Sequence, residues 1–303
     1  MIKFVEANDA SVIGALKVGA FRGAIKDMSG ASYHSLKKYY SSTDLKFMYG
    51  SSPQHFKAKY FDKTSEPDGP TPAMILGSLV HCLVLTPNEF DKEFVVEPGF
   101  NKRTNEGKAG YQEFLAKHEG KLIITDEMLA KANGMRSSVQ ANKKAMELLE
   151  PGLKEMAFFW ECPFSNLGMR AKLDQASSKH FVELKTTTSA GPEAFAKRCN
   201  DLHYDLSLFH YQTALKQTLD LDDVPAYFLV VENEPPYVTQ VYRAGGSCWQ
   251  TGHAKWLDAV TKLEDGIKMG NWPGYFPAEM DFPELEMPPW AVNKLMKGDQ
   301  DGV

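Results

Sequence analysis

Three consecutive strand-like segments constrain what this 303-residue chain can fold into more than any other feature. The short, turn-rich segments SNLG and SSK separate these three segments. Connections as short as these join antiparallel neighbours. The pattern therefore predicts an antiparallel meander formed by MAFFWECPF (156–164), GMRAKLDQA (168–176) and HFVELKTTT (180–188).

Helical patterns surround the meander on both sides. We expect helices in 41–61 (two short ones), 73–86, the second half of 98–120, 127–149, 192–198, 206–219 and 247–269. Strands are expected over 225–233 and 237–244, and a short strand or turn over 121–125. This order predicts an α+β fold, an α/β/α core in which a mixed central sheet is flanked by helices. Residues 1–30 are expected to be loosely ordered, 31–291 to form a single domain, and 292–303 to form a tail.

Composition excludes several classes of protein. The net charge of −5 is unusual for a general nucleic-acid coating protein and confines any DNA contact to one region. None of the four cysteines lies in a CxxC pair, which disfavours a zinc knuckle or an iron–sulfur cluster. No run reaches the roughly 18 apolar residues of a membrane helix, and Glu6 and Asp9 interrupt the N-terminus where a secretion signal is apolar. A cytoplasmic location without a membrane partner is therefore expected.

The most informative residues of the meander are Asp174, Glu183 and Lys185. Glu183 and Lys185 are two apart on one strand and share a face, and a hairpin can bring Asp174 alongside Glu183. Converging carboxylates repel unless a cation lies between them, and oxygen ligands favour a hard ion such as Mg²⁺. A lysine beside them can activate water and stabilise charge on a phosphate. The alternative is a surface hairpin with a salt-bridged Lys185.

Two helical residues extend this candidate site. His81 lies within the apolar helix LVHCLVL, four residues after Gly77 on the same helical face, and could complete a metal shell. The alternative for His81 is a hydrogen-bonded core histidine. Gln212, next to Tyr211 in LFHYQTALKQ, could hydrogen-bond to DNA or to the attacking water, or it could be an ordinary surface residue.

These residues, in this order, resemble the RecE-type (exonuclease VIII) branch of the PD-(D/E)xK nuclease superfamily, which is related more distantly to the RecB nuclease domain. The similarity extends from about Tyr33 to Trp290. It lies in the stretches SSTDLKFMYGSSPQHFKAKYF, LGSLVHCLVLTPNEFDKEFVVEPGFNKRTNEGK, GMRAKLDQ, FVELKTT, FHYQTAL and, weakly, NWPGYFPAEMDFPELEMPPW.

The resemblance implies a role for each matching residue. His81, Asp174, Glu183 and the backbone carbonyl of Leu184 would be metal ligands, and Lys185 would be the catalytic lysine. Thr186 would support catalysis and contact DNA. Gln212 matches the glutamine of a Q-x-x-x-Y motif, but Lys216 stands where that motif has tyrosine, and Tyr211 is the nearest substitute. The catalytic set is therefore Asp174, Glu183, Lys185 and Gln212.

The resemblance also implies an activity and partners. Such enzymes use one or two Mg²⁺ ions, which Mn²⁺ can replace, to degrade the 5′-ended strand of linear double-stranded DNA in the 5′→3′ direction. They leave 3′ overhangs for a single-strand annealing protein, and they form ring-shaped homo-oligomers around the DNA. The polar loop 101–108 is the expected DNA backbone contact, through Lys102, Arg103 and Lys108, together with Thr186 and Tyr211. A purely solvated loop is the alternative.

Three other functions compete with this prediction. The first is a RecB-like or Cas4-like nuclease of other polarity. The second is a catalytically silent DNA-binding ring subunit, which the intact set of Asp174, Glu183 and Lys185 disfavours. The third is a fold in which these residues bind a metal only for stability.

Overall fold

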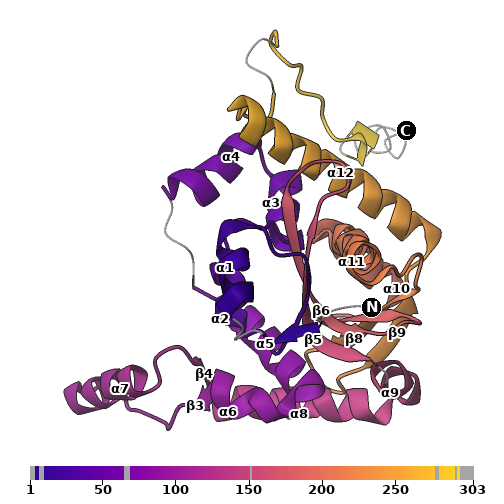
Figure 1. Cartoon of the computed structure of the whole chain (residues 1–303). Coiled ribbons are helices and arrows are strands. Elements are labelled where there is room, and N and C mark those ends of the chain that lie inside the picture. Colours follow the sequence, from indigo (N-terminus) through magenta and orange to yellow (C-terminus); the bar gives the residue numbers. More distant parts are fainter. Residues whose placement is uncertain are drawn as a thin grey trace, which may run out of the picture.

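The computed structural model describes residues 4–6, 10–64, 69–150, 152–276, 280–290 and 292–293. Its centre is a seven-stranded mixed sheet in the order β1-β2-β5-β6-β7-β8-β9 (Figure 1). The predicted meander forms the middle of this sheet: β6 (Gly168–Ala176) is antiparallel to both of its neighbours, β5 (Leu153–Glu161) and β7 (Phe181–Thr187). The outer strands are β1 (Phe4–Glu6), β2 (Gly23–Lys26), β8 (Ala226–Glu232) and β9 (Thr239–Arg243).

Helices cover both faces of the sheet. On one face α3 (Ser42–Gly50), α11 (Tyr204–Leu219) and α12 (Gly246–Met269) pack on a core that includes Phe158, Phe181 and Trp256. On the other face α5 (Pro72–Leu85) and α8 (Asp126–Ala141) bury Leu79 against Val182 and Leu229. The predicted α+β class with a mixed sheet between helices is thus confirmed (Figure 1).

The N-terminal segment is more ordered than its sequence pattern indicates. Residues 10–30 form α1 (Ala10–Val18) and β2, and α2 (Gly30–Ser35) follows, whereas we expected 1–30 to be loosely ordered. The reason is tertiary: β2 pairs with β5, which buries Ile25 completely against Phe159. A four-residue strand carries too short a pattern for periodicity to reveal it. Residues 1–3 and 7–9 lie outside the described part of the chain.

Local capping adjusts two other predicted elements. The expected helix over 127–149 is two helices, α8 and α9 (Lys143–Leu149), because the Asn142 side chain accepts from the Ala145 amide at 3.1 Å and caps a new N-terminus. The first helix of 41–61 is capped by Ser41, in a capping box with Asp44. The remaining elements are α4 (Pro53–Lys57), a π-helix (Ala58–Asp62), a 3₁₀ turn (Pro87–Glu89), α6 (Phe90–Glu93) and α10 (Pro192–Asp201).

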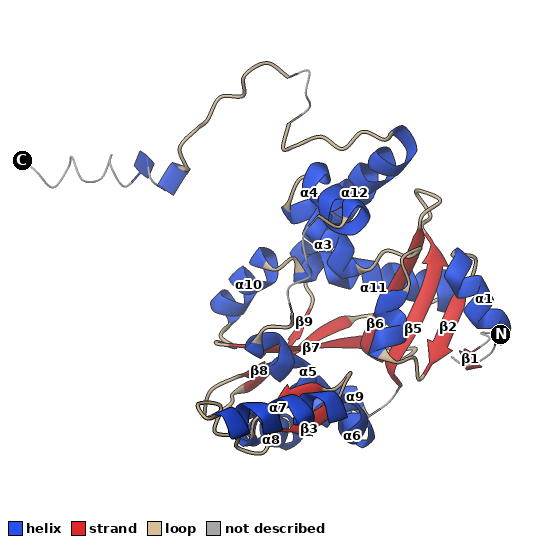
Figure 2. Ribbon diagram, turned by 90° about the vertical axis from the view of Figure 1, so that its left-hand side faces the viewer, coloured by secondary structure: helices blue, strands red, loops and turns tan. Residues whose placement is uncertain are grey.

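A small arm carries the predicted DNA loop. It consists of β3 (Phe94–Val96) paired in parallel with β4 (Leu122–Ile124), and of α7 (Asn105–Lys117), which extends away from the sheet (Figures 1 and 2). The loop turns tightly into α7, because a Cβ atom at Gly107 would lie 2.0 Å from the Asn101 carbonyl oxygen. Glycine is therefore required at Gly107 for the loop to close onto the helix.

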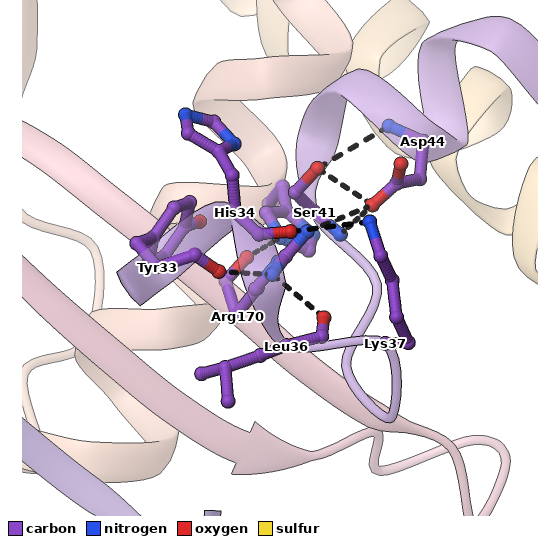
Figure 3. Close-up of polar contacts among 8 residues, drawn as sticks. Tyr33, His34, Leu36, Lys37, Ser41, Asp44 and Arg170 are labelled. Carbon is purple, nitrogen blue, oxygen red and sulfur yellow. Dashed lines mark hydrogen bonds and ion pairs between the residues drawn. The ribbon is translucent and has the colours of Figure 1, made fainter. Parts of the chain in front are cut away.

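A buried arginine anchors the start of α3 to the sheet. The Arg170 side chain, on β6, donates to the carbonyl oxygens of Tyr33 and Leu36, the second at 2.7 Å (Figure 3). Its guanidinium lies 3.8 Å from the Asp44 carboxylate, which also accepts from the Ser41 amide and hydroxyl at 2.7 Å each. This network fixes the N-terminal end of α3 relative to β6, and α3 in turn faces the candidate site.

Among the described residues, no helix combines the length and apolar character that a membrane crossing requires.

Candidate active site

The candidate site lies where β6 and β7 stop pairing. Their ladder joins Ala176 to Phe181 and Gln175 to Val182, and one further step of the same register places Asp174 opposite Glu183. At that step the Leu184 amide donates to the Asp174 Oδ2 atom at 2.7 Å. A side chain thus replaces the backbone acceptor, so the strands diverge and their polar side chains become available to other groups.

One half of the site joins β6 to α5. His81 Nδ1 lies 3.3 Å from Asp174 Oδ1, and the two side chains are 24% and 11% exposed. Glu155 joins them, because the register of β5 and β6 places it opposite Asp174. These three residues offer ligand atoms that all lie within 4.8 Å of one another. Glu155 also pairs with Lys172 at 2.7 Å.

Sequence reasoning missed Glu155. Its strand, LKEMAFFWE, resembles an ordinary core strand, and only the register with β6 brings Glu155 to Asp174. Its backbone adopts a left-handed conformation, with φ at 51°, which sequence patterns do not reveal.

The other half of the site joins β7 to α11 and α3. Lys185 Nζ donates to Glu183 Oε1 at 2.5 Å, so the predicted shared face of these two residues is observed. The Tyr211 hydroxyl lies 3.5 Å from the same carboxylate oxygen and 3.4 Å from the hydroxyl of Ser42. Tyr211, expected to contact DNA, is instead buried beside Glu183.

The two carboxyl groups have opposite pKa shifts. Burial and the nearby Asp174 charge raise the pKa of Glu183, and Lys185 only partly offsets this. Burial acts on Asp174 in the same direction, but His81 and Lys185 outweigh it and lower the pKa of Asp174. Conversely, burial alone would lower the pKa of His81, and the Asp174 carboxylate raises it. The ionisation of each of these groups therefore depends on the charges of its neighbours.

The donor set fits a hard divalent cation. The cluster offers carboxylate oxygens of Asp174 and Glu155 and the imidazole of His81, which is the chemistry that Mg²⁺ and Mn²⁺ accept, and Glu183 is not part of this cluster. The Glu183 Oε2 atom is buried and has no hydrogen-bond partner within the described chain. An orphaned carboxylate oxygen is costly, and a cation would satisfy it. The Leu184 carbonyl remains a predicted ligand.

Gln212 does not reach the site. Its side-chain amide lies against the loop after α11, where its nitrogen donates to the Leu221 carbonyl at 3.3 Å. With its oxygen and nitrogen atoms exchanged, the Gln212 amide donates to the Val224 carbonyl at 3.0 Å and accepts from the Asp223 amide at 2.9 Å. The predicted catalytic role is corrected for this reason: Tyr211 faces the sheet, and the next helical residue points elsewhere. Lys216, at the motif's tyrosine position, pairs with Asp222 at the surface.

The remaining predicted DNA contacts lie in two places. Lys102, Arg103 and Lys108 are exposed on the arm and not on the strands and helices that form the site. Thr186 is half-buried beside α5, and its Oγ1 atom would lie 3.7 Å from a Cβ atom at Gly77. Gly77 therefore lets this end of β7 lie close to the helix that carries His81. The DNA contacts themselves stay predictions.

A family model and one solved structure support the fold described above. Residues 41–280 match a family described as a PDDEXK-like domain of unknown function (DUF3799). The structure is similar to that of a candidate exonuclease from Eubacterium rectale, with a TM-score of 0.57, 14% identity and coverage of 90% of this chain and 99% of that one. A phage-related exonuclease from Haemophilus somnus 129PT matches with a TM-score of 0.28 and 12% identity, over 55% of this chain and 85% of that one. No curated protein matches the sequence.

Proposed function

The chain belongs to the PDDEXK-like family whose model matches residues 41–280, and on that premise we propose that it is a metal-dependent exodeoxyribonuclease. The substrate is linear double-stranded DNA, of which the enzyme degrades the 5′-ended strand in the 5′→3′ direction and leaves 3′ overhangs for recombination. One observation carries the proposal: the His81–Asp174 contact and the Glu183–Lys185 pair meet where β6 and β7 diverge.

Each residue has a distinct task in phosphodiester hydrolysis. His81, Asp174, Glu183 and Glu155 would hold one or two Mg²⁺ ions, which supply an activated water and neutralise charge on the phosphate. Lys185 places a fixed positive charge beside the reacting phosphate. Tyr211 and Ser42 hold Glu183 in orientation from the α11 and α3 side. With such ions bound, metal-activated water would be the nucleophile, so no covalent intermediate would be required.

End-labelled DNA tests activity and polarity together. Linear duplex carrying a label at either the 5′ or the 3′ end is incubated with Mg²⁺, with Mn²⁺ and with EDTA. We expect metal-dependent release of the 5′ label first, and a loss of about a hundredfold or more in Lys185→Ala. Lys262→Ala is a matched control, because Lys262 pairs with Asp258 on the surface of α12. Lys185→Ala activity equal to that of wild type would overturn the proposal.

Other outcomes of these measurements would support the competing functions. Release from 3′ ends would indicate a RecB-like or Cas4-like nuclease of other polarity. DNA binding without cleavage in any metal, unchanged in Lys185→Ala, would indicate a catalytically silent subunit. Metal-dependent thermal stability without DNA binding would indicate a structural metal site.

The proposed assembly is a ring-shaped homo-oligomer around DNA that passes its overhang to a single-strand annealing protein. A ring would explain how a chain of net charge −5 stays on DNA. Its test is the mass of the protein in solution by light scattering, with and without duplex ends. A monomer under both conditions would overturn the ring.

A further inference from the structure

A second lysine lies beside the candidate site. Lys46 projects from α3 and is half-buried, and its Nζ atom lies 5.6 Å from the centre of the Tyr204 ring. Lys185 approaches the same ring at 5.1 Å. Two ammonium groups that flank one aromatic ring repel each other, although each is attracted to the ring face.

Lys46 has no carboxylate partner among the described residues. The nearby carboxylate is that of Glu183, which already pairs with Lys185 and is also the proposed ligand of a cation. Burial of an ammonium group without a counter-charge is unfavourable. Burial, and then the charge of Lys185, lower the pKa of Lys46 to about 8. Lys46 is therefore a positive charge that no ion pair within the described part of the chain neutralises.

The position of Lys46 is fixed by the fold. Ser42, one helical turn earlier on the same face of α3, contacts the Tyr211 hydroxyl at 3.4 Å. The N-terminal end of α3 is anchored to β6 through Arg170 and Asp44 (Figure 3). The face of α3 that carries Ser42 and Lys46 is thus held toward Glu183 and Lys185 from the α11 side of the sheet.

We propose that Lys46 binds a phosphate of the substrate strand adjacent to the one that is cleaved. The inference rests on the proposed nuclease function and adds a residue to it. Lys185 contacts the phosphate that is cleaved, and Lys46 contacts the adjacent phosphate. The DNA strand is thus held at two points. DNA phosphates would supply the negative charge that the described carboxylates do not, and Lys46 is then a positioning residue for the reaction.

The test compares Lys46→Met, which keeps the length of the side chain and removes its charge, with Lys46→Arg, which restores the charge. Lys262→Met is the matched control, since Lys262 has its own partner in Asp258. Duplex binding is measured with Ca²⁺ as the metal over a range of salt concentrations. Cleavage is measured with Mg²⁺ over a range of DNA concentrations.

For Lys46→Met we expect about tenfold weaker binding and a slope of log K against log salt reduced by about 1. KM should rise by a similar factor with kcat within a few-fold of wild type, and Lys46→Arg should recover most of the loss. The thermal midpoint without DNA should stay equal or rise, because an unpaired buried charge is removed. Binding and salt slope equal to those of Lys262→Met would overturn the inference. An inactive wild-type protein would instead overturn the proposed nuclease, because binding is measured separately.

Discussion

Two regions of the molecule carry positive charge suited to DNA, and they differ in how that charge is held. On the arm, Lys102 is exposed, pairs with Glu97 at 2.9 Å and lies 3.7 Å from the Tyr111 ring centre. At the candidate site, Lys185 and Lys46 are half-buried; Lys185 pairs with Glu183, and Lys46 has no ion pair within the described chain. On the arm, Lys102 is thus paired with a close neighbour in sequence, whereas at the site Lys46 has no carboxylate partner among the described residues.

This difference shows why charge patterns alone locate DNA contacts poorly. An exposed lysine with a nearby glutamate gives up one partner to gain another, and solvent screens both interactions. A half-buried lysine without a partner gains the full interaction when a phosphate arrives. We therefore expect changes at the sheet to be severe and changes on the arm to be graded.

The largest effect is expected from Asp174→Asn. Asp174 contacts His81, accepts from the Leu184 amide and lies opposite Glu155, so its charge serves every part of the site. We expect about a thousandfold loss of kcat or more, since several kcal/mol of charge stabilisation depend on the bound metal. Asp258→Asn on the surface of α12 is the control. Nuclease activity of Asp174→Asn within tenfold of wild type would contradict an active site at Asp174.

Metal affinity should rise steeply with pH. The pKa of Glu183 is raised, mainly by burial, and that of His81 is raised by Asp174 against the effect of burial, so protons compete with a metal for both groups up to a higher pH than usual. As pH falls through the folded-state pKa values of these groups, we expect the affinity in calorimetric titrations to fall by about tenfold per pH unit for each proton displaced. In the metal-free protein the raised pKa of His81 stabilises the fold at acidic pH, and this contribution is lost as pH rises through the folded-state pKa. A flat pH profile for Mn²⁺ binding would contradict the assigned ligands.

Glu155→Gln separates the ligand set found in the structure from the one expected from sequence. Glu155 shares the 4.8 Å cluster with His81 and Asp174. We expect the Mg²⁺ concentration for half-maximal activity to rise by about tenfold, with activity recovering at saturating metal. Glu161→Gln, on the same strand but paired with Arg22 at the surface, should behave as wild type. An unchanged metal requirement in Glu155→Gln would leave Glu155 as a partner of Lys172 alone.

Much of this architecture could be predicted from sequence because its determinants are local. The meander follows from alternation and short turns, and the common face of Glu183 and Lys185 follows from their spacing. Asp174 could be placed beside Glu183 because a three-residue turn joins their strands. The contact of His81 with Asp174 was expected from a helical position together with a family resemblance.

The remaining features depend on tertiary placement. Whether Tyr211 or Gln212 faces the sheet depends on the rotation of α11, since neighbouring helical residues differ by about 100°. Glu155 enters the site only through its register with β6, and Lys46 only through the anchoring of α3 more than a hundred residues before β7. Local patterns do not encode either.

The smallest effect is expected on the arm. The triple variant Lys102→Ala, Arg103→Ala, Lys108→Ala should weaken DNA binding by a few-fold, equally for all sequences, and leave kcat unchanged, because such contacts position the backbone without reading bases. Glu97→Gln frees Lys102 from its ion pair and should tighten binding slightly. The decisive measurement is the salt slope of the triple variant beside that of Lys46→Met. If three exposed charges reduced the slope by three times as much as Lys46→Met does, the arm would be a full phosphate-binding surface, and exposure would not diminish its role.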